Sequence, residues 1–262
     1  MNPPVSRLIL EGRTVIVTGA ASGVGAATAR RASAEGATVV LVDLNGGQLD
    51  AVGAGIAEGG GVFSKVIADV SDDGACRDVV DTAIGLTGRL DGLVNNAGIP
   101  GSFGALSVGT EDEFDRIVDV NLKGAWLLFR AARDALVLNR GSVVNTLSYA
   151  AGRASTDLGF YGMTKAGLRS LTQTTAVELA RFGVRVNAVA PGPIDTPMIR
   201  KLEARVNPGD NDAGRRKIAR GVPMRRYGRP EEIASAIVFL LGPDASFITG
   251  TVLAVDGGMA AL

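Results

Sequence analysis

One tyrosine and one lysine of the chain are spaced so that they would share a face of a helix. Tyr161 and Lys165 lie four residues apart in a segment of helical periodicity, and Ser148 lies upstream at the end of an apolar run. Residues i and i+4 of a helix are neighbours on its surface. A free phenol has a pKa of about 10, and a nearby cation favours its ionised form and lowers that value. With Ser148 to hold a substrate oxygen, these side chains indicate proton transfer at a carbonyl or an alcohol.

The other two tyrosines lack this setting. Tyr149 is followed at i+4 by Arg153, but the intervening Ala-Ala-Gly comes directly after a strand-like run and is not expected to be helical. Tyr227 is followed at i+4 by Glu231, whose charge would raise the pKa of the phenol. Because Tyr–Lys pairs at this spacing also occur on solvated helix faces, the hypothesis needs an independent motif.

The composition excludes several other kinds of chemistry. The 262 residues are 46% hydrophobic and 21% charged, which suits a globular protein. The 27 basic residues balance the 27 acidic ones, so nothing predicts binding to nucleic acid or to an anionic membrane. The chain has no histidine and one cysteine, Cys76, which excludes a histidine-based triad, a Cys–His pair, the usual zinc sites and an internal disulfide. Any proton chemistry must therefore use Tyr, Lys, Asp or Glu, and we expect no metal.

The sequence carries no targeting or membrane signal. Residues 1–12 have neither a long apolar stretch nor a small-residue cleavage pattern. No apolar run approaches the roughly 18 residues that a membrane span needs. These features predict a cytoplasmic protein without a membrane segment.

Short apolar runs alternate along the chain with longer stretches of helical periodicity. Continuous β-branched runs predict strands that are covered on both faces, at 14–18, 38–43, 62–69, 92–95, 142–147, 185–190 and 252–256. Helices are predicted between them, at 25–35, 73–86, 111–138, 159–182 and 231–241. This alternation predicts an α/β fold of the Rossmann type, a doubly wound parallel sheet of about seven strands with helices on both faces. No linker or charge block divides residues 1–262, so we expect one domain.

Local signals mark two helix starts and one irregular segment. Thr110 followed by Glu113 predicts a capping box, and Pro230 is placed for the first turn of the helix that follows it. Residues 196–229 are rich in Arg, Gly and Pro and contain no predicted strand. We expect this segment to be a lid over the substrate, and a solvated surface excursion is the alternative.

The first predicted strand runs directly into a glycine-rich segment. Thr18 is followed by Gly19, Gly23 and Gly25, and a helix is predicted next. Glycines here permit a tight turn and let a pyrophosphate approach the backbone N–H groups at the positive end of the helix. The spacing is G-x-x-x-G-x-G rather than the usual G-x-G-x-x-G. The inference of dinucleotide binding therefore depends on the position between the first strand and a helix.

Asp43 ends the second predicted strand. A carboxylate at this place accepts hydrogen bonds from the ribose hydroxyls of NAD and repels the 2′-phosphate of NADP. No Arg or Lys lies in the glycine loop or just after Asp43 to offset that repulsion. Two unit charges about 4 Å apart interact by roughly 4 kcal/mol at an effective dielectric of 20. The sequence therefore predicts NAD as the cofactor.

Together these motifs resemble the classical short-chain dehydrogenase/reductase family over roughly residues 10–258. The matching motifs are the glycine loop 18–25, Asp69-Val70, Asn95-Asn96-Ala97-Gly98, Asn121, the Ser148/Tyr161/Lys165 set, Pro191-Gly192 with Ile194, Thr196 and Met198, and Asp256-Gly257-Gly258. The resemblance implies that the catalytic residues are Asn121, Ser148, Tyr161 and Lys165. It implies that the cofactor contacts Gly19, Ser22, Gly23, Val24, Gly25, Asp43, Leu44, Asp69, Val70, Asn96, Ala97, Gly98, Tyr161, Lys165, Pro191, Gly192, Ile194 and Thr196.

The resemblance also implies a role for each catalytic residue. Tyr161 would be the general acid/base in hydride transfer between nicotinamide and an alcohol or ketone, and Ser148 would orient the substrate oxygen. Lys165 would lower the pKa of Tyr161 and hydrogen-bond the nicotinamide ribose. Asn121 would hold a water that links Lys165 to solvent, with a merely helix-kinking polar residue as the alternative.

The segments expected around the substrate are mostly apolar or small. They are the loop 99–106, the variable stretch 153–160 with Leu158, residue Ile194 and the covering segment 197–221. We therefore expect an uncharged, moderately apolar secondary alcohol or ketone. An anionic substrate remains open, although solvated charge is favoured for the arginines that would bind it, Arg215, Arg216 and Arg220.

The family resemblance implies a homotetramer, with the helices at 111–138 and 159–182 in one interface and residues 249–262 in another. Two other functions stay open. The first is a 3-oxoacyl-thioester reductase, a role that usually favours NADP, against which Asp43 argues. The second is a non-catalytic dinucleotide-binding regulator, which would have no chemical need for all four catalytic residues.

Overall fold

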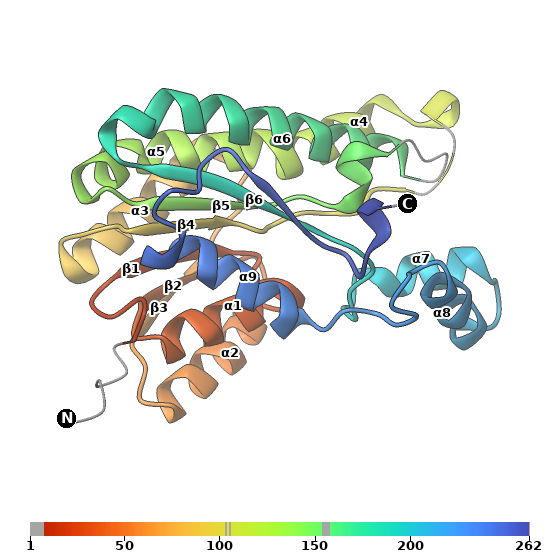
Figure 1. The fold of residues 1–262 in the computed structure, drawn as a ribbon, viewed down its shortest axis with the longest axis horizontal. Helices are drawn as coiled ribbons and strands as arrows, with labels where there is room; N and C mark the ends of the chain where they lie inside the picture. The colour runs from red at the N-terminus through yellow and green to blue at the C-terminus, as the bar shows by residue number, and fades with distance from the viewer. Residues whose placement is uncertain (1–7, 103, 105, 154–157, 262) are drawn as a thin grey trace.

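The computed structural model describes residues 8–102, 104, 106–153 and 158–261. Its strands form one seven-stranded parallel sheet in the order β3-β2-β1-β4-β5-β6-β7 (Figure 1). The strands are β1 Thr14–Thr18, β2 Thr38–Asp43, β3 Phe63–Ile67, β4 Gly92–Asn95, β5 Ser142–Thr146, β6 Arg185–Pro191 and β7 Val252–Val255. The order reverses between β1 and β4, and in such sheets ligands bind at the carboxyl ends beside this switch point. The predicted fold class is confirmed.

Helices cover both faces of the sheet. One layer contains α1 (Gly23–Ala34), α2 (Gly46–Glu58) and α9 (Pro230–Leu241). The other contains α3 (Asp73–Thr87), α5 (Gly124–Asn139) and α6 (Gly159–Leu179), as Figure 1 shows. None of the described helices is both long and apolar enough to cross a membrane.

The central strands are buried because each face packs against a helical layer. Val15 and Val17 of β1 join the apolar cluster on the side of α1 and α9, whereas Ile16 between them joins the cluster on the side of α3 and α5. Successive side chains of a strand point to opposite faces, so a strand between two layers is largely apolar on both faces. This explains the continuous apolar runs of the sequence.

Helix α2 was not among the predicted helices. Its sequence contains four glycines, which disfavour a helix. Asn45 caps it by accepting a hydrogen bond from the backbone N–H of Gln48 (3.1 Å). One of the glycines, Gly53, lies so close to β3 that an added Cβ would fall 2.3 Å from the ring of Phe63. Close packing on the sheet thus outweighs the low helix propensity.

The helix predicted at 111–138 is interrupted. It consists of α4 (Glu111–Val118), a π-helical turn (Asp119–Lys123) and α5. At its start Thr110 Oγ1 accepts from the N–H of Glu113 (3.3 Å), but the Glu113 carboxylate accepts from the N–H of Ser102 instead of completing the box. Only half of the predicted capping box therefore forms, whereas Pro230 occupies the first turn of α9 as predicted.

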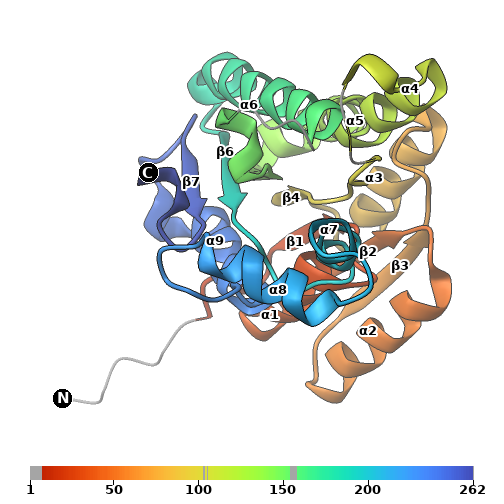
Figure 2. The ribbon, with the colours of Figure 1, turned by 90° about the vertical axis from the view of Figure 1, so that its right-hand side faces the viewer.

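The irregular segment 196–229 contains two short helices, α7 (Ile199–Val206) and α8 (Asn211–Arg220). An isolated bridge between Ile194 and Gly228 closes the base of the segment. Figure 2 shows α7 and α8 in front of the strands, across the end of the sheet from which β6 emerges. The segment is therefore placed where a lid over a ligand would lie.

Candidate active site

The glycine loop between β1 and α1 is held against the end of β4. Thr18 Oγ1 donates to Val94 O (3.2 Å) and accepts from the N–H groups of Asn96 and Ala97 (both 3.0 Å). The Asn96 side chain donates to Thr18 O (3.0 Å). Gly19 then turns the chain with φ +64°, in the left-handed region that favours glycine. Asn96, predicted to contact the cofactor, therefore also positions the loop.

The start of α1 is open for an anion. Gly25 lets the helix begin against the turn, because an added Cβ would fall 2.0 Å from Gly19 O. Ser22 is the N-cap residue, but its side chain makes no capping hydrogen bond, and the first turn contains no acidic residue. The first N–H groups of the helix therefore have no capping side chain and can bind a phosphate.

Asp43 lies at the end of β2 beside this loop. Its Oδ2 accepts from the N–H of Ala21 (3.1 Å) and its Oδ1 from the N–H of Asn45 (3.1 Å). A carboxylate has about four acceptor sites, so capacity remains for ribose hydroxyls. Leu44, also predicted to contact the cofactor, is exposed and does not line the same cleft.

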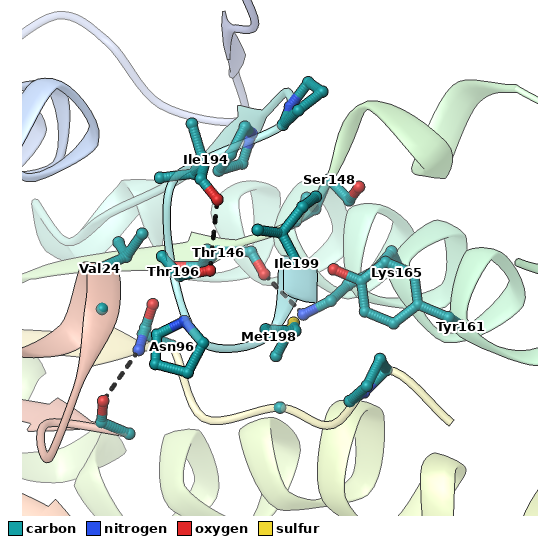
Figure 3. A pocket seen from close by; sticks show the side chains of 18 of the residues that line it. Val24, Asn96, Thr146, Ser148, Tyr161, Lys165, Ile194, Thr196, Met198 and Ile199 are labelled. Carbon is teal, nitrogen blue, oxygen red and sulfur yellow. Dashed lines mark hydrogen bonds between the residues drawn. The ribbon is translucent and has the colours of Figure 1, made fainter. Parts of the chain in front are cut away.

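A cleft runs from the glycine loop across the carboxyl ends of the central strands (Figure 3). The predicted residues that line it are Gly19, Ser22, Gly23, Val24, Asp43, Asn96, Ala97, Gly98, Ser148, Tyr161, Lys165, Pro191, Gly192, Ile194 and Thr196. Further wall residues are Pro100, Thr146, Leu147, Tyr149, Leu158, Pro193, Pro197, Met198, Ile199 and Leu202. The predicted residues that do not line it are Gly25, Leu44, Asp69, Val70 and Asn121.

Asp69 and Val70 lie in the connection between β3 and α3. Asp69 Oδ1 accepts from both the N–H (2.9 Å) and the hydroxyl (2.7 Å) of Ser71, which fixes the turn. Val70 packs so closely on the start of α5 that a Cβ at Gly124 would fall 2.9 Å from Val70 O. Their predicted contact with the adenine remains a prediction.

The proposed catalytic side chains meet on one wall of the cleft. Tyr161 and Lys165 project from the same face of α6, with Lys165 Nζ 5.5 Å from the centroid of the Tyr161 ring. Lys165 is 3% exposed and donates to Thr146 O at the end of β5 (2.8 Å). Ser148 follows β5 within hydrogen-bonding reach of Tyr161, and its Oγ accepts from the N–H of Ala150 (3.2 Å). Figure 3 shows Ser148, Tyr161 and Lys165 together.

Burial is the main cause of the pKa shifts of Tyr161 and Lys165. It raises the pKa of Tyr161 to about 12, although the hydrogen bond to Ser148 acts in the opposite direction. Burial also lowers the pKa of Lys165 to about 8. The Tyr161 pKa is thus raised overall and not lowered, because the burial of the phenolate outweighs the hydrogen bond to Ser148. The effect of Lys165 on this pKa remains a prediction. At neutral pH the phenol is protonated and is able to donate.

Asn121 lies in the π-helical turn and is buried. Its Oδ1 accepts from the N–H of Ile99 (2.8 Å), and its Nδ2 donates to Ile99 O (2.9 Å) and to Thr164 Oγ1 (3.2 Å). The Thr164 hydroxyl in turn donates to Tyr161 O (2.8 Å). Asn121 therefore ties the loop after β4 to the turn of α6 that carries Tyr161.

Gly98 brings Asn121 and Lys165 close to each other. A Cβ added at Gly98 would fall 3.2 Å from Asn121 Oδ1 and 3.5 Å from Lys165 Nζ. A side chain here would be tight against the Asn121 amide and in van der Waals contact with the Lys165 amine. Asn121 is thus a neighbour of Lys165 without lining the cleft, and its role in a water relay remains a prediction.

Charged side chains hold the irregular segment 196–229 to Asp195, which follows β6. Arg215 pairs with Asp195 (2.6 Å) and lies over the ring of Tyr227 (4.5 Å), and Arg200 binds both Asp195 (2.7 Å) and Glu203 (3.0 Å). Glu203 is 1% exposed, and its carboxylate is paired with Arg200 (3.0 Å) and Arg215 (3.7 Å), as a buried charge requires. The cluster holds α7 and α8 on the segment that follows β6.

This cluster bears on whether the substrate is an anion. Neither Arg200 nor Arg215 lines the cleft, and Arg215 is engaged by carboxylates rather than solvated. Arg216 is largely exposed, 3.9 Å from Asp210, as expected for a solvated charge. Among the described lining residues Lys165 is the only cation.

Several wall residues lie outside the motifs. Thr146 supplies the carbonyl that Lys165 binds, and Tyr149 begins a short 3₁₀ helix directly after Ser148. Their only signal in the sequence was proximity to Ser148. The expected wall positions 103, 105 and 154–157 lie outside the described residues.

Proteins of known activity share this chain's sequence pattern. The family profile described as Enoyl-(Acyl carrier protein) reductase matches residues 19–260. The levodione reductase of Leifsonia aquatica is 38% identical over 252 residues, which cover 95% of this chain and 94% of that protein. The 3-oxoacyl-(acyl-carrier-protein) reductase of Thermotoga maritima is 38% identical over 255 residues, which cover 95% and 98%.

Solved structures show the same fold. The crystal structure of levodione reductase superposes with a TM-score of 0.94 at 37% identity and covers 96% of this chain and 99% of that one. The crystal structure of NAD⁺-bound xylitol dehydrogenase gives a TM-score of 0.90 at 33% identity and covers 95% and 99%.

Proposed function

This chain belongs to the classical short-chain dehydrogenase/reductase family, and we infer from that premise that it is an NAD-dependent oxidoreductase acting on alcohols and ketones. We further propose that Tyr161 is its general acid/base. The observation that carries the proposal is that Ser148, Tyr161 and Lys165 share one cleft with the glycine loop and Asp43. A non-catalytic regulator would not need the three reactive side chains in this place.

The residues that line the cleft suit the pyrophosphate, the adenosine ribose and the nicotinamide half of a dinucleotide. The glycine loop and the uncapped start of α1 would hold the pyrophosphate, and Asp43 the adenosine ribose. Residues 191–196 and Lys165 would hold the nicotinamide half. When bound, the nicotinamide supplies or accepts the hydride.

The chain's own residues handle the substrate oxygen and the proton. The Ser148 hydroxyl would donate to the oxygen and polarise the carbonyl. The Tyr161 phenol, protonated at neutral pH, would pass its proton to that oxygen as the ketone is reduced. The Lys165 ammonium would stabilise the phenolate that remains. Alcohol oxidation runs these steps in reverse and needs the ionised phenol.

The pH dependence of ketone reduction should follow the charge on Lys165. With a pKa of about 8 it is an ammonium below that pH and a neutral amine above it, whereas Tyr161, with a pKa of about 12, stays protonated throughout. We expect kcat/KM for reduction to be nearly constant from about pH 6 to 7, to be about halved near pH 8 and to fall further above it. The test is to measure initial rates at saturating NADH and varied ketone concentration from about pH 6 to pH 10. The Lys165→Met variant should be slow, and its rate should not decline above about pH 8. A wild-type rate that rises through pH 8 would contradict the role of the Lys165 charge.

The walls favour an uncharged, moderately apolar substrate. Leu147, Leu158 and Pro100 form one side of the substrate end, and Met198 and Ile199 face it from the lid segment. An anion would find no cation among the described lining residues except Lys165, whose charge the proton step requires. We propose that residues 196–229 cover this end once the substrate is bound.

A matched pair of ketones tests the substrate class. With NADH, 4-methylcyclohexanone should be reduced with a kcat/KM at least about tenfold higher than 4-oxocyclohexanecarboxylate, because burying an unpaired carboxylate costs more than about 1.4 kcal/mol. Preference for the carboxylate would show that the substrate class is wrong. Absence of turnover with both ketones and with their alcohols would count against the oxidoreductase itself.

The runner-up substrate is a 3-oxoacyl thioester. The Thermotoga maritima relative, a 3-oxoacyl-(acyl-carrier-protein) reductase, favours it. Asp43 in the cleft argues against it, because that role usually requires NADPH. An acetoacetyl thioester assayed with each cofactor separates the two candidates, since efficient NADPH-dependent reduction would favour the runner-up.

We also propose that the protein is a cytoplasmic homotetramer. Leu138 of α5 and Val177 of α6 are 81% and 82% exposed, although both are large and apolar. Their exposure supports an interface on the outer face of these helices. Sedimentation of the purified protein measures the assembly.

A further inference from the structure

Tyr149 is a second phenol in the cleft. It follows Ser148 directly and begins the 3₁₀ helix Tyr149–Gly152. Ser148 has an extended backbone, and its Oγ accepts from the N–H of Ala150 (3.2 Å), which holds the turn in place. As a result Ser148, Tyr149 and Tyr161 all line the same cavity, with Leu158 beside them.

The other hydroxyls around the substrate end already have a task or a partner. Thr196 Oγ1 donates to Ile194 O (3.4 Å). Thr146 Oγ1 is shut off from solvent and cannot meet a ligand in this arrangement. Ser148 and Tyr161 are assigned to the reacting oxygen. Among the described residues of this wall, Tyr149 is therefore the remaining neutral donor.

The Tyr149 hydroxyl is suited to a neutral partner. Burial raises its pKa, and the nearby charge of Arg153 opposes that rise only in part, so the group is a protonated donor at neutral pH. A phenol can also accept a hydrogen bond. The wall around it is mostly apolar, and a polar group that loses water on ligand binding must find a new partner or cost free energy.

We propose that Tyr149 binds a second oxygen of the substrate, so that the preferred substrates are ketones or secondary alcohols that carry a further neutral hydroxyl or carbonyl group. This inference rests on the proposed oxidoreductase function. It assigns Tyr149 to substrate recognition and leaves the proton step to Tyr161.

Ketones that differ only by one oxygen test this assignment. The probes are cyclohexanone and its 2-, 3- and 4-hydroxy derivatives, each reduced with NADH by the wild type and by Tyr149→Phe. In the wild type at least one hydroxyketone should have a kcat/KM about three- to tenfold above that of cyclohexanone, mainly through KM. In Tyr149→Phe this ratio should fall to about one, with the cyclohexanone rate within about twofold of the wild type.

Tyr227→Phe is the matched control, because it removes a phenol hydroxyl that does not line the cleft. It should keep the wild-type ratio between hydroxyketone and cyclohexanone. Melting temperatures show whether each variant is folded.

The outcomes separate the two proposals. A preference that persists in Tyr149→Phe, or a wild type that reduces cyclohexanone without preferring any hydroxyketone, overturns the role of Tyr149 and leaves the oxidoreductase function intact. A wild type that reduces none of the four ketones with NADH counts against the proposed function and overturns the inference with it.

Discussion

Tyr161→Phe is expected to lower kcat for ketone reduction by about 10²- to 10⁴-fold, the usual worth of a positioned general acid. The substitution removes one oxygen and leaves the ring on α6. No other described hydroxyl of this wall is expected to replace it, because Ser148 is assigned to the reacting oxygen and Tyr149 to a second oxygen of the substrate. The affinity for NADH should stay within about threefold, since at most one neutral hydrogen bond is lost.

The measurement combines two readouts. Initial rates at saturating NADH give kcat, and the fluorescence of bound NADH gives its dissociation constant without turnover. Tyr227→Phe controls for the loss of a phenol elsewhere in the chain. A Tyr161→Phe enzyme that is folded, binds NADH and turns over a good ketone at nearly the wild-type rate would show that the proton comes from another group.

Wild-type enzyme should prefer NADH to NADPH by at least about tenfold in kcat/KM. The Asp43 carboxylate lines the cleft at the end of β2, and the glycine loop beside it contains no cation. Two negative charges about 4 Å apart repel by roughly 4 kcal/mol at an effective dielectric of 20, and a third of that is already a factor of about ten. Because the effect is electrostatic, the preference should shrink at high ionic strength.

Asp43→Asn should reduce the preference for NADH. It should weaken the binding of NADH, and it should remove the charge that repels the 2′-phosphate of NADPH. Asparagine retains one oxygen acceptor, so it keeps one of the hydrogen bonds that Asp43 makes to Ala21 and Asn45 and disturbs the loop less than alanine would. Asp78→Asn is the control, because it removes an exposed carboxylate of α3 that does not line the cleft. Initial rates at equal concentrations of the two cofactors measure each ratio. A wild-type preference for NADPH would show that the inference from Asp43 is wrong.

The strands were predictable because of a physical constraint on them. A strand covered on both faces is apolar on both, so the middles of β1 and β2 appear as continuous apolar runs in the sequence. Helix α2 was not predictable in the same way. Its glycines are tolerated because Gly53 packs against Phe63 of β3, a contact between residues in different elements.

The site was predictable where a residue's role depends on its own chemistry. Tyr161 and Lys165 are neighbours because of helix geometry, and Gly19 and Gly23 adopt positive φ because of the turn after β1. The task of Asn121 depends on residues far away in the sequence. Its hydrogen bonds to Ile99 and the π-helical turn around it become visible only in the folded chain.

By itself the sequence determined the parallel α/β sheet, the cleft at its carboxyl edge and the set of groups that can move a proton there. It could do so because alternation, turns and helix spacing are local properties of the chain. Only the tertiary structure decided the pKa values of Tyr161 and Lys165. It also decided that Arg215 pairs with Asp195 and that Tyr149 lines the cleft. Each of these depends on burial and on charges brought together by folding, and no local pattern records how much water a side chain loses.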